Sequence, residues 1–121
     1  GIPYLIFFLT PIVPLVLAVG FLSIMDTVTG IAKARKLGER IHSSKMSRTI
    51  TKLVFYAIAI ILGRLMEIHF VPWMPIAQIT AGYIALVEFK SNIENIGLLT
   101  GTDLWKGLKE RFEVAVKGKR E

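Results

Sequence analysis

Uncharged residues gather into blocks along the chain, and this pattern predicts helices that cross a membrane. The first block, Ile2 to Met25, has 24 residues and no charge. Because a membrane-spanning helix needs about 20 mainly apolar residues, a first span is expected over about residues 2–25. Pro3, Pro11 and Pro14 predict a bent or late-starting helix, whose freed carbonyls need other partners. A secretory signal peptide is the alternative, but the block is too long and lacks a basic n-region.

Two shorter apolar stretches follow the first block. They predict a second span over residues 52–71 and a third over 74–89. Pro72 and Pro75 break the helix between these two spans, so a tight turn is expected there. Trp73 lies in this turn, and tryptophan suits a membrane–water interface.

Two charged residues interrupt the second span. Arg64 and Glu67 are three positions apart, so they lie on one helix face and can pair. Because a charge inside a membrane is costly, the pair needs an explanation. In one interpretation Arg64 extends to the outer surface with Glu67 beside it. In the other, the pair marks a polar face that lines water or contacts another subunit.

Positive charge is concentrated after the first and third spans. The loop 26–51 together with Lys52 contains seven Lys or Arg and two acidic residues, and the tail 90–121 contains another seven Lys or Arg. Short loops rich in Lys and Arg stay in the cytoplasm, so the N-terminus is expected outside and the C-terminus inside. This distribution explains the net charge of +6 without a nucleic-acid partner. It also favours contact with anionic lipid headgroups.

Small and polar residues form a stripe along the third span. Ala77, Ala81, Ile84, Glu88 and Asn92 recur at steps of three and four, and therefore share a helix face. Small residues allow helices to approach closely in lipid, and Ser, Asn and Glu can hydrogen-bond across the contact. A bundle that forms oligomers is therefore expected. The candidates for helix packing, subunit contact or pore lining are Ala59, Gly63, Arg64, Glu67, Ala77, Ala81, Glu88, Ser91, Asn92 and Asn95.

Three charged residues are expected at one depth near the cytoplasmic boundary. Asp26 ends the first span, Lys52 begins the second and Glu88 ends the third. The expected topology brings these ends together, so salt bridges or shared hydrogen bonds are predicted. The alternative is that each residue is a solvated charge at a helix end. The predicted polar layer consists of Asp26, Thr29, Gly30, Arg48, Lys52 and Glu88.

Capping signals divide the loop and the tail. The loop is expected to break near Gly38, and Ser43, Ser44 or Ser47 can cap the helix that enters the second span. In the tail, Asp103 or the preceding threonine can cap a short amphipathic helix. That helix is expected to lie on the inner leaflet or to pack against neighbouring subunits. Its apolar positions step by four: Leu104, Leu108, Phe112 and Val116.

The sequence offers no set of residues for catalysis. The chain has no cysteine, which excludes disulfides and thiol chemistry. It has no phosphate-binding Gly-rich loop, no Ser-His-Asp set and no HExxH motif. His69 has no second ligand at metal-binding spacing. We therefore expect no enzyme activity, no cofactor and no metal site.

Two motifs carry a family resemblance. Asp26-Thr27-Val28-Thr29-Gly30 matches a D-x-x-T-G pattern, and the segment from Glu88 to Asn95 matches E-x-x-S-x-x-E-N. With these motifs in this order at the span boundaries, the chain resembles the bacteriophage holin family (phi29-type and toxin-secretion/phage-lysis holins). The motif residues are Asp26, Thr29, Gly30, Glu88, Ser91, Glu94 and Asn95.

The pattern of residues thus predicts an all-α protein with three spans and a C-terminal amphipathic helix, and with the resemblance it is interpreted as a single holin-like membrane domain over residues 1–121. The resemblance also implies a multi-pass protein of the bacterial inner membrane that forms homo-oligomers. Such a protein permeabilises the membrane for endolysin release or protein secretion, with the endolysin as its functional partner. Two alternatives stay open. One is a structural anchor subunit of a larger phage-derived or secretion complex, and the other is a small ion-channel or transporter subunit.

Overall fold

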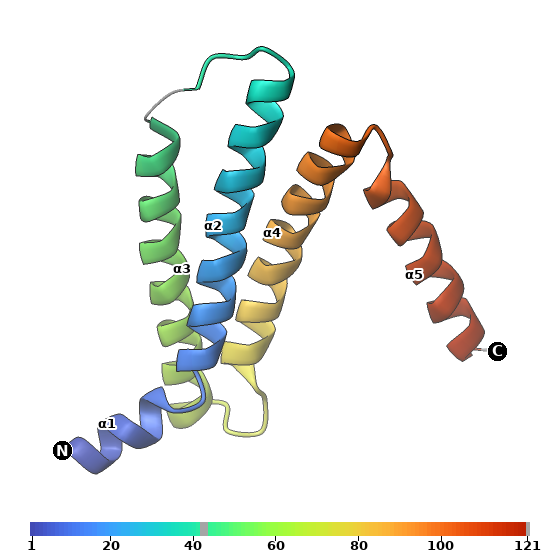
Figure 1. Ribbon diagram of the computed structural model, residues 1–121. Coiled ribbons are helices and arrows are strands. Elements are labelled where there is room, and N and C mark those ends of the chain that lie inside the picture. Colours follow the sequence, from blue (N-terminus) through green and yellow to red (C-terminus); the bar gives the residue numbers. More distant parts are fainter. Residues whose placement is uncertain (42–43, 121) are drawn as a thin grey trace.

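The computed structural model describes residues 1–41 and 44–120, and every regular element in them is an α-helix. The expected all-α class is therefore confirmed. Figure 1 shows the helices in chain order along the colour ramp. They are α1 (Ile2–Leu9), α2 (Val13–Lys36), α3 (Ser44–His69), α4 (Ile76–Thr100) and α5 (Leu104–Arg120).

The prolines of the first block separate α1 from α2. Pro11 has no N–H to donate to the carbonyl of Phe7, four residues earlier. The N–H of Ile12 bonds to Leu9 O at 3.0 Å instead of to Phe8 O. The regular helix therefore restarts at Val13, close to the start expected from Pro14. The break leaves the carbonyls of Phe7 and Phe8 without partners inside the helix.

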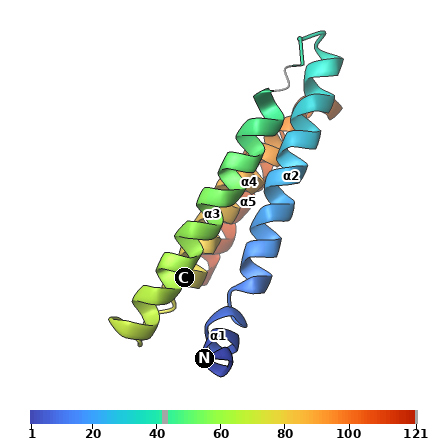
Figure 2. The same cartoon turned by 90° about the vertical axis from the view of Figure 1, so that its left-hand side faces the viewer.

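Helices α2, α3 and α4 pack side by side along their lengths, with α3 antiparallel to the other two (Figures 1 and 2). The connection after α2 and the end of α4 therefore lie at the same end of the bundle. The turn between α3 and α4, with α1 near it, lies at the other end. Gly101, with φ +74°, ends α4 in the left-handed conformation, and α5 then turns back and diverges from α4 (Figure 1).

The basic connection is shorter than the loop expected over 26–51. Helix α2 continues past Asp26 to Lys36, and α3 begins at Ser44. The expectation failed in this detail because basic residues end an apolar stretch but need not end a helix. The chain does break near Gly38, whose φ is +73°. Ser43, one of the predicted caps, lies outside the described residues.

Polar and apolar side chains are distributed in the reverse of a water-soluble bundle. The interior holds small or apolar residues such as Val19 and Ile60 together with many polar ones. The buried polar residues are Ser23, Thr29, Thr49, Arg64, Glu88, Asn92 and Asn95. Large apolar residues cover the outside instead, among them Leu17, Phe21, Phe55, Leu62, Tyr83 and Leu86. A surface of this kind is suited to lipid or to other helices.

Two of the described helices, α2 and α3, are long and apolar enough to cross a membrane. The expected third span corresponds to α4, whose apolar part is shorter. Its uncharged stretch runs only from Ile76 to Val87 before Glu88, or 12 residues. That stretch is about 18 Å long, against a hydrocarbon core of about 30 Å.

Candidate functional site

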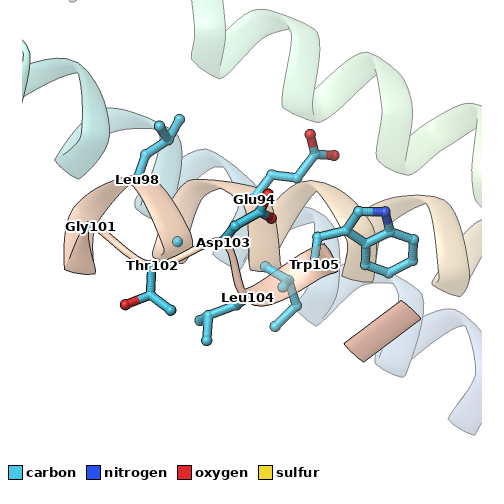
Figure 3. A pocket seen from close by; sticks show the side chains of 9 residues that line it. Glu94, Leu98, Gly101, Thr102, Asp103, Leu104 and Trp105 are labelled. Atoms are coloured by element: carbon cyan, nitrogen blue, oxygen red, sulfur yellow. The ribbon is translucent and has the colours of Figure 1, made fainter. Parts of the chain in front are cut away.

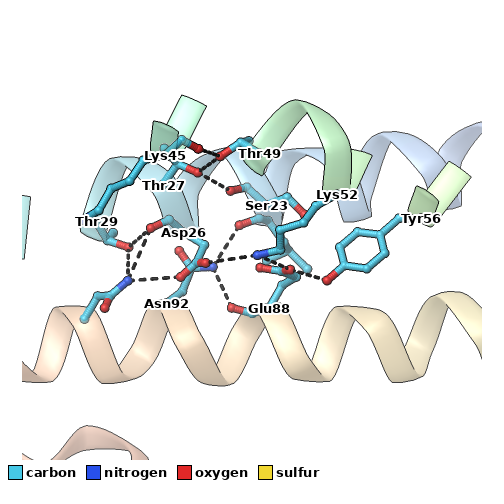
Figure 4. A network of polar contacts seen from close by, with 12 residues as sticks. Ser23, Asp26, Thr27, Thr29, Lys45, Thr49, Lys52, Tyr56, Glu88 and Asn92 are labelled. Atoms are coloured by element: carbon cyan, nitrogen blue, oxygen red, sulfur yellow. Dashed lines mark hydrogen bonds and ion pairs between the residues drawn. The ribbon is translucent and has the colours of Figure 1, made fainter. Parts of the chain in front are cut away.

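Lys52 lies between the two acidic residues of the predicted polar layer. The Lys52 Nζ atom lies 2.9 Å from Glu88 Oε1 and 3.6 Å from Asp26 Oδ2. The salt bridges expected among these three residues are therefore present (Figure 4). Glu88 is 1% exposed, and the hydroxyl of Tyr56 also donates to its Oε1 at 2.6 Å. The layer thus joins α2, α3 and α4 around one buried carboxylate.

Two asparagines on α4 extend this network to the backbone of α2. The Nδ2 group of Asn92 donates to Leu22 O at 3.0 Å and to Glu88 O at 2.8 Å. The Nδ2 group of Asn95 lies 3.1 Å from Asp26 Oδ1 and 3.0 Å from Thr29 Oγ1. The last residue of the second motif therefore bonds directly to the first motif. The second motif provides the amide donor and the first motif provides the oxygen acceptors, so the two motifs together hold α4 against α2.

Other members of the two motifs lie around this contact. A Cβ atom placed on Gly30 would lie 3.7 Å from Asn95 Nδ2, so Gly30 faces the asparagine. Ser91 is half-buried and lines a cavity of about 240 Å³ together with Arg48. Glu94 is exposed and points away from the layer, toward a second cavity of about 430 Å³ beside α5 (Figure 3).

Arg64 and Glu67 form the predicted pair and also hold the opposite end of the bundle. Arg64 Nη1 lies 2.9 Å from Glu67 Oε2. The Nε and Nη2 groups of Arg64 donate to Phe8 O at 3.0 Å and Phe7 O at 2.9 Å. These are the two carbonyls that the proline break leaves free. Glu67 Oε1 accepts the N–H of Ala77 at 2.8 Å, at the start of α4.

This geometry matches neither interpretation of the Arg64–Glu67 pair, the one with Arg64 at the outer surface or the one with a polar face toward water or another subunit. Arg64 is only 8% exposed, so it does not extend to the surface. The groups it contacts belong to this chain, at the end of α1 and on α3. The pair therefore caps two helix ends, which satisfies backbone groups that would otherwise be orphaned inside the membrane.

The small residues of the stripe pack inside the chain. Gly63 approaches α4 so closely that a Cβ atom there would lie 3.3 Å from both Ala77 Cα and Thr80 Oγ1. Ala77 and Ala81 are 2% and 3% exposed, while Ala59 is partly buried against the same core. In this structure the stripe is covered by α2 and α3 of the same chain rather than presented to another subunit.

Several polar contacts were not anticipated from the sequence. The hydroxyls of Thr27 and Thr49 bond to each other between α2 and α3. Lys36 Nζ donates to the carbonyls of Leu98 and Leu99 at the end of α4, at 3.2 and 2.6 Å. The contact of Lys36 could have been considered from the sequence, because a cation is stabilised near the carbonyl end of a helix. Nothing in the sequence indicated the contact between the two threonines, since isolated hydroxyls are common in apolar helices.

The tail forms the predicted helix, and Asp103 caps it. Asp103 Oδ1 accepts the N–H of Lys106 at 3.1 Å. Only the first turns of α5 pack on α4, where Lys90 Nζ lies 5.5 Å from the centre of the Trp105 ring. Phe112 and Val116 are 60% and 50% exposed. The apolar face of α5 is thus left uncovered within this chain.

The chemistry of the described residues is structural rather than catalytic. No group of three His, Asp or Glu among them is placed to hold a metal ion. The buried charges Arg64 and Glu88 bond to other side chains, and Arg64 also bonds to backbone carbonyls. Two buried oxygens, Ser23 Oγ and Glu88 Oε2, have no partner among the described residues.

Comparison with known proteins agrees with the two motifs. The family model for the bacteriophage holin family matches residues 4–115. The chain belongs to this family. No curated protein and no solved structure is significantly similar to it. Holins are non-enzymatic membrane proteins, and membership implies membrane permeabilisation during host lysis. The absence of catalytic machinery expected from the sequence agrees with this class.

Proposed function

We propose that this member of the holin family permeabilises the bacterial inner membrane as a homo-oligomer, so that an endolysin reaches the cell wall or a protein is secreted. The reversed distribution of side chains carries the proposal. Phe21, Phe55 and Leu86 are 64%, 63% and 62% exposed. Surfaces of this kind are covered by lipid tails and by neighbouring copies, which matches a protein that acts within the bilayer.

The proposed topology has three spans, with the N-terminus outside and the C-terminus in the cytoplasm. Helix α4 runs beside α2 in the same direction, which supports its crossing the membrane with α2 (Figure 1). The concentration of Lys and Arg after Asp26 supports a cytoplasmic location for that end. Glu88, the first charged residue of α4, pairs with Lys52 inside the bundle, which offsets the shortness of the apolar part of α4.

Permeabilisation requires this closed bundle to rearrange. Its outer faces are apolar, and a pore lined by such faces would expel water. The groups suited to line water, such as Glu88, Asn92 and Asn95, are buried between helices. We infer that α4 separates from α2 in the open state, and that its stripe then lines the pore or contacts a second copy.

A test in cells separates this function from its alternatives. Expression in a bacterium should collapse the membrane potential, measured with a voltage-sensitive dye, and should lyse the culture only when an endolysin is also produced. Cells without the gene are the reference, and insertion is confirmed by membrane fractionation. Normal growth and an unchanged potential, with insertion confirmed, would refute the permeabilising function.

One observation favours the structural alternative. Asn92 and Asn95 find partners within their own chain, as in a subunit whose polar residues only hold its shape. A structural anchor predicts a non-lytic complex that co-purifies with other proteins in fixed stoichiometry. The pairing of Glu67 with Arg64 and Ala77 disfavours a channel in which Glu67 lines the conduction path.

A further inference from the structure

We propose that the cavity beside the polar layer binds a phosphate group, and that an anionic phospholipid headgroup is its source. The cavity lies between α2, α3 and α4, and its volume is about 240 Å³. Its lining includes Lys45, Arg48 and Lys52 from α3, Asp26 from α2 and Ser91 from α4.

The balance of charge around the cavity favours an anion. Three cations line it, against one carboxylate. That carboxylate, Asp26, is already occupied, because it pairs with Lys52 and accepts from Asn95. The second acid of the layer, Glu88, does not line the cavity and is held by Lys52 and Tyr56. Both acids of the layer thus have partners other than the two remaining cations, and Glu88 Oε2, which has no partner, is buried away from the cavity.

Lys45 and Arg48 are those two cations. Among residues 1–41 and 44–120, neither lies within ion-pair distance of a carboxylate. They are three positions apart on α3, and Lys52 follows four positions later, so all three share one helix face. An arginine fork and a lysine ammonium on one face suit the oxygens of a phosphate. The hydroxyl of Ser91, on the opposite wall, adds a further donor.

The position of the cavity favours a lipid as the source of the phosphate. Its lining residues on α3, from Lys45 to Lys52, belong to the half of that helix that begins next to the basic connection. Basic pockets between membrane helices at this depth bind anionic headgroups. The inference concerns binding alone, so a chain that fails to lyse cells can still satisfy it.

The test compares two double variants that remove the same charge. The double variant Lys45→Gln with Arg48→Gln removes the two unpaired cationic side chains that line the cavity. Arg35→Gln with Arg40→Gln removes two exposed basic residues that do not line it. The full chain in detergent micelles is titrated with phosphatidylglycerol or phosphatidylcholine, and bound lipid is counted by native mass spectrometry. We expect at least tenfold weaker phosphatidylglycerol binding for the cavity variant and less than threefold for the control. Phosphatidylcholine binding should be weak throughout.

A cavity-filling variant and a competition with inorganic phosphate complete the test. Ser91→Leu fills the cavity without changing charge and should also weaken phosphatidylglycerol binding, which guards against a misfolded double variant. Inorganic phosphate added as a competitor separates the sources: displacement of the lipid at equal concentration identifies free phosphate as the ligand and overturns the lipid assignment. Equal weakening by the cavity and control variants would overturn the site itself, because it would reduce the effect to general surface charge.

Discussion

Replacement of Arg64 tests how the proline break is stabilised. Arg64→Met keeps a long unbranched side chain but removes the donors to Phe7 O and Phe8 O and the partner of Glu67. Phe7 O cannot return to helical bonding because Pro11 has no N–H. The N–H of Ile12, which Phe8 O would need, bonds to Leu9 O instead. The substitution therefore leaves two acceptors and one carboxylate with fewer partners at a site where Arg64 is 8% exposed.

The expected cost follows from these lost partners. Removing one member of a buried ion pair costs about 3–5 kcal/mol in soluble proteins. Hydrogen bonds between membrane helices average only about 0.6 kcal/mol, because the unfolded state finds other partners in the membrane. Glu67 also keeps the N–H of Ala77. We therefore expect Arg64→Met to lower the free energy of unfolding by about 3 kcal/mol, at the low end of the buried-pair range.

The assay measures both global and local stability. Unfolding in mixed micelles is followed by far-ultraviolet circular dichroism, and release of α1 by hydrogen exchange of its amides. The double variant Arg64→Met with Glu67→Gln should recover about 1–2 kcal/mol, because the unpaired charge is gone. Its α1 amides should still exchange fast. Arg35→Met, at an exposed position, should change stability by less than about 0.5 kcal/mol. A loss below 1 kcal/mol for Arg64→Met, with α1 exchange unchanged, would refute this role.

Three further predictions test helix packing and orientation. Asn95→Leu should destabilise the bundle by about 1–3 kcal/mol, because it removes the amide that donates to Asp26 Oδ1 and Thr29 Oγ1 on α2; an unchanged unfolding curve in micelles would contradict the motif contact. Gly63→Leu should lower the midpoint of that curve far more than Gly82→Leu. A Cβ atom at Gly63 on α3 would lie against the backbone of Ala77, whereas one at Gly82 on α4 would have no neighbour within 4 Å; equal shifts would contradict close packing of α3 on α4. In the proposed topology, a membrane-impermeant maleimide added to spheroplasts should label Trp73→Cys and not Ser47→Cys; the opposite result would invert the orientation.

The polar layer could be predicted because its signals are local. Asp26, Lys52 and Glu88 each end or begin an apolar stretch, and the order of spans alone brings their helices to one depth. The D-x-x-T-G and E-x-x-S-x-x-E-N motifs added the residues next to them. The spacing of the residues predicts which face of each helix they share, and the topology predicts their depth in the bundle. Together these two predictions bring the three charged residues into contact.

The partners of Arg64 and of the α4 stripe could not be predicted in the same way. Helical spacing shows that Ala77 and Asn92 share a face, but it does not show whether that face meets its own chain or another copy. Arg64 contacts carbonyls more than 50 positions away in sequence, and only the packing of α1 on α3 brings them near. The prolines signalled that free carbonyls exist, but not which residue would bond to them.

Under the proposed function, the contacts that close the bundle also set the cost of opening it. Separation of α4 from α2 gives up the contacts of Asn92 and Asn95 and rearranges the Lys52 bridges. At about 0.6 kcal/mol for each hydrogen bond in a membrane, these contacts total only a few kcal/mol. A second copy carries the same donors and acceptors, so an intermolecular contact replaces each one at nearly equal energy. The closed chain is then favoured when copies are dilute, and rising concentration in the membrane shifts the balance toward assemblies by mass action.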